Sequence, residues 1–113
     1  MIEQGDVVWV DLPLPRGSEP GYRRPAVVVQ GNALNRSRIR TVVCIPLTTQ
    51  VRWADAPGNV LLPSEMTGLP YVSVAMASQI LTADQSWLGE KTGSLGGREL
   101  HLVLSAIDIV LGR

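Results

Sequence analysis

The stretch between residues 17 and 29 reads GSEPGYRRPAVVV and joins a turn-rich segment directly to an apolar run. Glycine and proline recur in residues 17–25, whereas residues 26–29 are small or β-branched, a combination typical of a loop that enters a buried strand. A second apolar run ends in PLTTQ at residues 46–50. The two junctions bring a carboxylate, two guanidiniums and two hydroxyls to the ends of predicted strands, where we expect phosphate chemistry.

The β-branched and alternating segments predict five strands, at residues 7–12, 26–30, 41–46, 59–62 and 71–77. Segments 13–25 and 63–70 are rich in Pro, Gly and Ser, as expected of loops between short antiparallel strands. The stretch TADQ at residues 82–85 fits a capping box and predicts a short helix that ends near Gly89. The predicted fold is α+β and mostly β, a small barrel of antiparallel strands with a short helix and a C-terminal helix.

Residues 98–111 predict the only long helix, and this helix is apolar on two sides. One face is formed by Leu100, Val103, Leu104, Ile107 and Leu111, and Leu102, Ala106 and Ile109 nearly close the circle. Such a helix needs two surfaces to pack against, so we expect the sheet on one side and a second subunit on the other, which makes the protein a homodimer. His101 falls on the remaining polar stripe, where we expect it to be inert.

The length and composition predict one domain that spans residues 1–113. No cationic start is followed by an apolar leader, and no apolar run approaches membrane-spanning length, so we expect a soluble cytoplasmic protein without a membrane partner. The single cysteine, Cys44, lies in an apolar stretch without neighbouring Cys or His. We therefore expect a small core residue, and neither a disulfide nor a metal site nor a cofactor.

The net charge is zero, but the basic residues are unevenly distributed. Segment 16–52 holds seven of the ten basic residues, all of them arginine, and its only acid is Glu19, so its local charge is seven minus one, or plus six. This pattern fits a basic face that binds the phosphates of a nucleic acid, and it equally fits an ordinary solvated surface. Charge alone leaves both interpretations open.

Four motifs together resemble the MazF/PemK (Kid) family of toxin endoribonucleases. They are GDVVWVDL at residues 5–12, Gly17-Ser18-Glu19 with Arg24-Pro25, Asn35-Arg36, and PLTTQ at residues 46–50. The resemblance implies an SH3-like, CcdB/PemK-type barrel with a C-terminal helix and a homodimer. It also implies sequence-selective cleavage of single-stranded RNA without a metal, and a cognate antitoxin that holds the enzyme inactive.

The residues at the two junctions suit this chemistry. Metal-free cleavage lets the ribose 2′-OH attack its own phosphate, which requires a proton acceptor, a proton donor and positive charge. Arg24 can clamp the phosphate but is never a base, and Pro25 biases it towards an extended backbone that aims its side chain. Thr48 can donate its hydroxyl to a nonbridging oxygen. The resemblance assigns the catalytic pair to Arg24 and Thr48.

Glu19 is the predicted third catalytic residue, and two roles remain open for it. As the only carboxylate of the basic segment, it can accept the 2′ proton, although neighbouring arginines would lower its pKa and make it a weaker base. Alternatively, it pairs with Arg23 or Arg24 and orders the loop.

Further residues are expected to contact RNA: Arg23, Arg36, Arg38, Arg40, Gln50, Arg52, Trp53 and Gln79. Arg36, Arg38 and Arg40 recur at every second residue, so a strand or extended loop would place them on one face that follows phosphates. Trp53 either stacks on an unpaired base or packs back onto the barrel. Trp9 is expected in the core or an interface.

One motif departs from the resembling family, because Val72 stands where many relatives carry an acid, although Gln79 retains the glutamine that follows. Two other functions also remain open on this fold. One is a CcdB-like poison of DNA gyrase, which the ending Val110-Leu111-Gly112-Arg113 argues against because it lacks the expected Trp-Gly-Ile. The other is an RNA-binding barrel without chemistry, which would need the arginines but not Thr48.

Overall fold

The computed structural model describes residues 1–113 as seven antiparallel strands and three helices. The strands are β1 (Asp6–Leu12), β2 (Tyr22–Val28), β3 (Thr41–Thr48), β4 (Asn59–Leu62), β5 (Ser73–Met76), β6 (Leu81–Asp84) and β7 (Leu88–Ser94). The helices are α1 (Asn32–Asn35), α2 (Ser64–Thr67) and α3 (Gly97–Val110), and single 3-10 turns span Val51–Trp53, Ala77–Gln79 and Gln85–Trp87. No helix has both the length and the apolar character that crossing a membrane requires.

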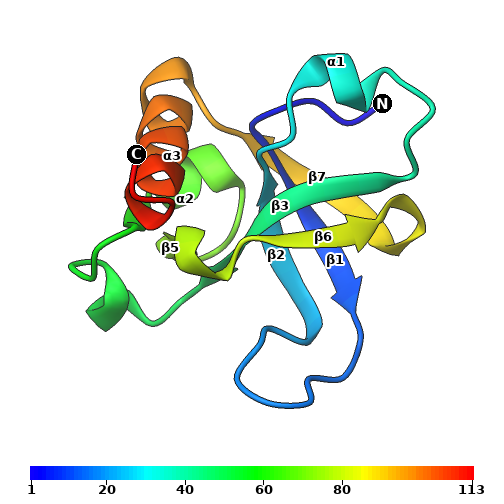
Figure 1. Ribbon diagram of the computed structural model, residues 1–113. Helices are drawn as coiled ribbons and strands as arrows, with labels where there is room; N and C mark the ends of the chain where they lie inside the picture. Colours follow the sequence, from blue (N-terminus) through cyan, green and yellow to red (C-terminus); the bar gives the residue numbers. More distant parts are fainter.

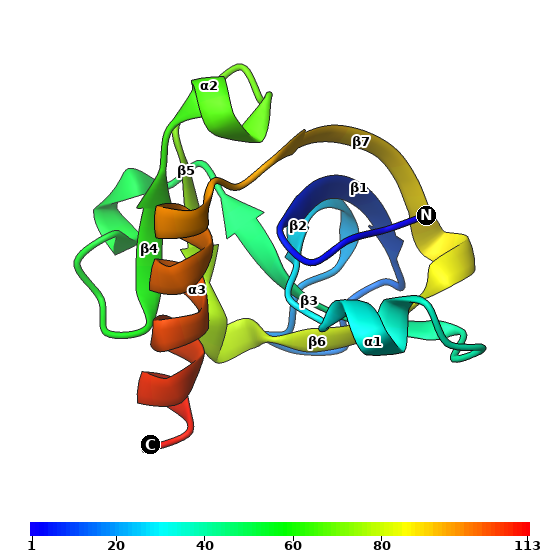
Figure 2. The ribbon, with the colours of Figure 1, turned by 90° about the horizontal axis from the view of Figure 1, so that it is seen from above.

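The sheet runs in the order β4-β5-β3-β2-β1-β7, and β6 pairs with the first half of β3. β3 is central because its first half pairs with β6, its end with β5, and its middle with β2. Figure 2 shows the sheet curling around itself, with β7, β1 and β2 wound into one half and β4 and β5 beside α3 in the other. The predicted α+β, mostly-β fold is confirmed.

Both faces of the curled sheet are buried, which explains the uninterrupted apolar run at residues 26–29. Val27 lies in a cluster under α3, whereas Ala26 and Val28 lie in a second cluster on the opposite face. Cys44 belongs to the second cluster and is 1% exposed, as predicted. Burial in this apolar environment raises the pKa of its thiol to about 12.

α3 packs on β4 and on the turn Ala77–Gln79 through its buried residues Val103 and Ala106 (Figure 1). Its outer side leaves Leu102, Ile109 and Leu111 exposed, and His101 is exposed as expected. The helix is therefore apolar both towards the sheet and towards solvent. This second apolar side is the basis for the homodimer, which stays a prediction.

The predicted helix after Thr82 is wrong. Residues 81–84 form β6, in which Ala83 is buried opposite Val42 of β3. The capping residue is Asp84, whose Oδ1 accepts hydrogen bonds from the Ser86 N–H at 2.9 Å and the Ser86 hydroxyl at 2.7 Å. The cap thus starts a single 3-10 turn, because β7 follows at once and pairs with β1.

The sequence missed β6 and β7 and misplaced one or both ends of β1, β2, β3 and β5. β2 begins at Tyr22, inside the segment predicted as loop, and β5 spans only Ser73–Met76. β7 reads LGEKTGS, a polar edge strand without an apolar alternation that would reveal it. β7 forms because it pairs with β1, since its own sequence carries no strand pattern.

Candidate active site

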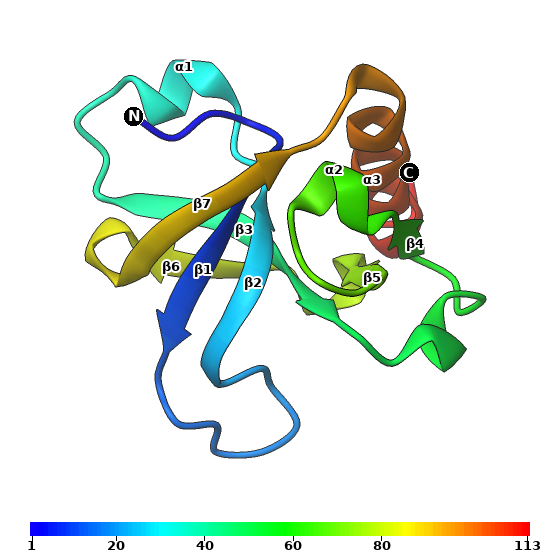
Figure 3. The ribbon, with the colours of Figure 1, turned by 180° about the vertical axis from the view of Figure 1, so that it is seen from behind.

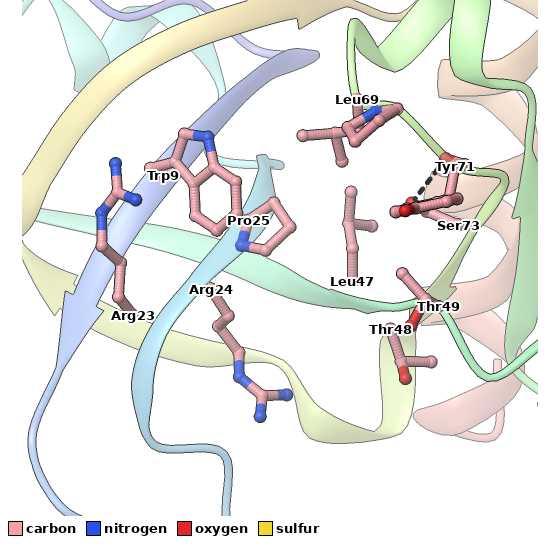
Figure 4. Close-up of a pocket in the computed structure, with 11 residues that line it drawn as sticks. Trp9, Arg23, Arg24, Pro25, Leu47, Thr48, Thr49, Leu69, Tyr71 and Ser73 are labelled. Atoms are coloured by element: carbon pink, nitrogen blue, oxygen red, sulfur yellow. Dashed lines mark hydrogen bonds between the residues drawn. The ribbon is translucent and has the colours of Figure 1, made fainter.

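A cleft of about 400 Å³ opens between the start of β2 and the end of β3. Figure 4 shows its two walls, with Trp9 and Pro25 on one side and Leu69, Tyr71 and Ser73 on the other, and with Leu47 between them. Arg23, Arg24, Thr48, Thr49 and Pro70 complete the lining. The cleft is thus largely apolar, with cationic and hydroxyl groups along one side.

The strand register brings Arg24 and Thr48 to the same cleft. Ala26 pairs with Pro46, so extending this antiparallel register by two residues sets Arg24 level with Thr48, beyond the last paired residues. Both side chains line the cleft and extend to the same side of it in Figure 4. The two junction motifs singled out in the sequence therefore line one cleft.

The polar atoms of these two residues are available to a ligand. The Nε of Arg24 donates to the carbonyl of Gly21 at 3.2 Å, which orients the guanidinium, and its terminal nitrogens make no hydrogen bond or ion pair. The Oγ1 of Thr48 accepts the N–H of Gln50 at 3.2 Å. This hydroxyl donates to no group in the protein, so its hydrogen is free to donate to a phosphate oxygen.

Arg23 is engaged differently from its neighbour. It lies opposite Asp11 in the β1–β2 pair, with its Nε 3.7 Å from the carboxylate, and its guanidinium lies over the Trp9 ring at 4.4 Å. Arg23 therefore fixes the outer side of the Trp9 wall, and Trp9 lines the cleft instead of lying fully in the core.

Glu19 lies in the exposed β1–β2 loop and does not line the cleft. Its Oε1 accepts the N–H of Gly17 at 2.6 Å. Hydrogen bonds from its own backbone N–H and from those of Arg16 and Gly17 lower its pKa below the ordinary value. The alternative ion pair with Arg23 or Arg24 is absent, so the loop is ordered by backbone contacts.

The three alternating arginines lie away from the cleft. Arg36 caps α1, and Arg38 and Arg40 follow in an exposed turn before β3 begins at Thr41. They do not form the predicted strand face, although all three are exposed to solvent. Arg36 lines a separate hollow with Asp6 and Lys91, whose side chains form an ion pair at 3.2 Å.

The remaining predicted contacts form a continuous path from the cleft. Thr49 lines both the cleft and a shallow hollow that also contains Gln50 and Arg52. The guanidinium of Arg52 lies 5.2 Å from the centre of the Trp53 ring, and the Trp53 Nε1 donates to Gln50 at 3.2 Å. Trp53 is 46% exposed and lines a further hollow with Gln79. The indole is therefore accessible to solvent.

The sequence missed the upper wall of the cleft. Ser73 is 1% exposed, and its hydroxyl donates to the Tyr71 carbonyl at 3.4 Å. Tyr71 itself is 67% exposed, an aromatic residue after Pro70 in a segment read as loop and strand start. Val72, at the position of the missing acid, does not line the cleft, so the lining contains arginines but no carboxylate.

The profile of the family described as "PemK-like, MazF-like toxin of type II toxin-antitoxin system" matches residues 3–111. The chain belongs to this family. The endoribonuclease MazF6 of Mycobacterium tuberculosis is 36% identical over 111 residues, covering 98% of this chain and 97% of the relative. The endoribonuclease MazF of Staphylococcus saprophyticus is 35% identical over 112 residues, covering 99% and 92%.

Solved structures of this family share the fold. The MazF structure from Deinococcus radiodurans superposes with a TM-score of 0.82 at 26% identity and covers 99% of this chain and 97% of that one. A mycobacterial endoribonuclease in complex with its cognate antitoxin gives 0.80 at 25% identity, covering 99% and 96%. The resemblance to MazF/PemK toxins inferred from the motifs is therefore confirmed.

Proposed function

We propose that this MazF/PemK-family toxin is an endoribonuclease that cleaves single-stranded RNA without a metal ion. The observation that carries the proposal is that one cleft is lined by Arg24, whose terminal guanidinium nitrogens are unpaired, and by Thr48, whose hydroxyl hydrogen is unused. The relatives named endoribonuclease support it over the gyrase poison and the inactive RNA-binding barrel.

The proposed reaction is an attack of the ribose 2′ oxygen on the adjacent phosphorus. The new 2′-O–P bond forms as the bond to the 5′ oxygen breaks and this oxygen takes a proton from water, so the upstream product carries a 2′,3′-cyclic phosphate and the downstream product a 5′-hydroxyl. Arg24 binds the nonbridging oxygens on which negative charge accumulates, and Thr48 donates a hydrogen bond to the same phosphate.

The cleft lining holds neither a carboxylate nor an imidazole, which limits the routes for the 2′ proton. It passes either to water or to Glu19 in the neighbouring β1–β2 loop. The Glu19→Gln variant separates these routes. The path through Thr49, Gln50, Arg52 and Trp53 supports RNA binding beyond the cleaved nucleotide, with Trp53 able to stack on an unpaired base.

The test compares cleavage by the wild type with that by Arg24→Ala and Thr48→Val. Removing the guanidinium should lower kcat by about 10²–10³-fold, the cost of one transition-state donor. Thr48→Val keeps the shape of the side chain and removes only its hydrogen bond, so it should retain RNA binding but cleave more slowly. A wild type that cuts no RNA, or an Arg24→Ala variant with wild-type kcat, contradicts the proposal.

We also propose a protein partner, an antitoxin with an acidic and partly disordered tail that covers the arginine-rich segment in the cytoplasm. The solved complex of a mycobacterial endoribonuclease with its cognate antitoxin and the MazE-MazF structures from Deinococcus radiodurans support this kind of partner. The product of a neighbouring gene should co-purify with the toxin and compete with RNA. If no such product inhibits cleavage, this proposal is wrong.

A further inference from the structure

The wall of the cleft opposite Trp9 presents an aromatic ring that the proposed chemistry does not use. Tyr71 is 67% exposed, and its hydroxyl makes no hydrogen bond within the chain. It nevertheless lines the same cleft as Arg24 and Thr48. A large ring left in solvent beside a phosphate-binding group points to a contact with the ligand.

The backbone beneath Tyr71 is well held. Its carbonyl accepts the hydroxyl of Ser73, which is almost fully buried, and Pro70 precedes it. One residue further back, Leu69 is buried in the main core and its N–H donates to Thr67 at 3.2 Å. The ring therefore projects from an anchored segment, which reduces the entropy lost when it contacts a ligand.

The opposite wall carries a cation on its outer face. The Arg23 guanidinium lies over the Trp9 ring at 4.4 Å, and its Nε lies 3.7 Å from the carboxylate of Asp11. Figure 4 shows Trp9 and Pro25 facing Leu69 and Tyr71 across the cleft, with Arg24 and Thr48 along its lower side. A flat apolar space beside two phosphate-binding groups has the chemistry of a nucleotide subsite.

Resting on the proposed function, we infer that Tyr71 stacks on the nucleobase that adjoins the cleaved phosphate. The base enters between the Trp9 and Tyr71 walls while its phosphate lies on Arg24 and Thr48. The cleft lining contains no carboxylate that would repel this phosphate. Tyr71 thus contributes to binding of the nucleotide at the cleaved bond.

The experiment starts from cleavage sites mapped on a long RNA of mixed sequence. A short RNA that spans one mapped site is made with all bases, with an abasic nucleotide 5′ of the cleaved bond, and with one 3′ of it. Tyr71→Ala should lower kcat/KM on the intact RNA by about 5- to 150-fold, the effect of losing one base–aromatic stack. For the wild type, one of the two abasic RNAs should give a kcat/KM lower than that of the intact RNA by a similar factor. For Tyr71→Ala, the same abasic RNA should give almost the same kcat/KM as the intact RNA.

Two variants serve as controls. Tyr71→Phe keeps the ring and should cleave like the wild type. Val72→Ala removes the adjacent exposed side chain, which does not line the cleft, so this variant should also cleave like the wild type. Wild-type cleavage by Tyr71→Ala, or equal losses from both proteins on each abasic RNA, would overturn the inference alone. If the wild type cuts no RNA at all, the proposed function fails and this inference fails with it.

Discussion

Arg24 and Thr48 show why the proposed catalytic residues can be recognised in the sequence. Each follows from a strand junction marked by proline, and a paired strand register brings the two junctions level. Tyr71 was missed because the sequence places it at the start of a predicted strand, whereas β5 begins only at Ser73, and the strand pattern does not show which cleft an exposed aromatic residue lines. A local sequence pattern locates the ends of strands, but it does not show which residues lie opposite those ends in the fold.

For Glu19, we predict a small effect on catalysis. Its carboxylate is stabilised by backbone N–H groups and its pKa is lowered, so it is a weak base at neutral pH. Glu19→Gln should reduce the single-turnover cleavage rate by less than tenfold, whereas losing a general base costs about 10²–10⁴-fold. A loss in that larger range, measured on the same RNA at pH 7, would instead assign the 2′ proton to Glu19.

For Cys44, the prediction concerns stability at alkaline pH. The folded protein holds the thiol protonated up to a pKa of about 12, against an ordinary value of 9.0, so the unfolded chain loses its proton first. The contribution of this group is fully present below pH 9 and is lost as the pH rises through the folded pKa. The free energy of unfolding, measured in urea, should therefore fall more steeply above pH 9 for the wild type than for Cys44→Ala. Parallel pH profiles of the two proteins would contradict the burial effect.

At the scale of elements, the strands with β-branched runs were predicted and the strands defined by their neighbours were not. The segment 59–62, which reads NVLL, matches β4 residue for residue. β6 carries a capping-box sequence, yet Ala83 is buried against β3 and the pairing overrides the local helix signal. The polar edge strand β7 exists only through its pairing with β1.

The contact between α2 and β7 supplies a stability test (Figure 3). Gly68 ends α2 with a φ of +74°, and a Cβ there would lie 1.9 Å from the Thr92 carbonyl oxygen. Gly68→Ala should therefore destabilise the protein by about 1–3 kcal/mol in urea unfolding. Gly97→Ala, at the open start of α3 where nothing lies within 4 Å, should not destabilise it; equal losses at both sites would contradict this account.

Across the molecule, the outer side of α3 is an apolar surface that no other part of the chain covers. Leu102, Ile109 and Leu111 are exposed there, next to Leu61 of β4. If this surface joins two subunits, the wild type should sediment at twice the 12.2 kDa of one chain and Ile109→Asp should sediment as a monomer. His101→Asp, which adds the same charge at an exposed polar position, should remain dimeric. A monomeric wild type at micromolar concentration would contradict the predicted homodimer.

The ends of the cleaved RNA show whether the cleft of Arg24 and Thr48 cleaves RNA without a metal ion. Wild type and Arg24→Ala are incubated with a long RNA in EDTA, and the new ends are identified chemically. We expect 2′,3′-cyclic phosphate and 5′-hydroxyl ends from the wild type and almost none from Arg24→Ala. Loss of wild-type cleavage in EDTA, or ends with a 3′-hydroxyl and a 5′-phosphate, would refute this mechanism.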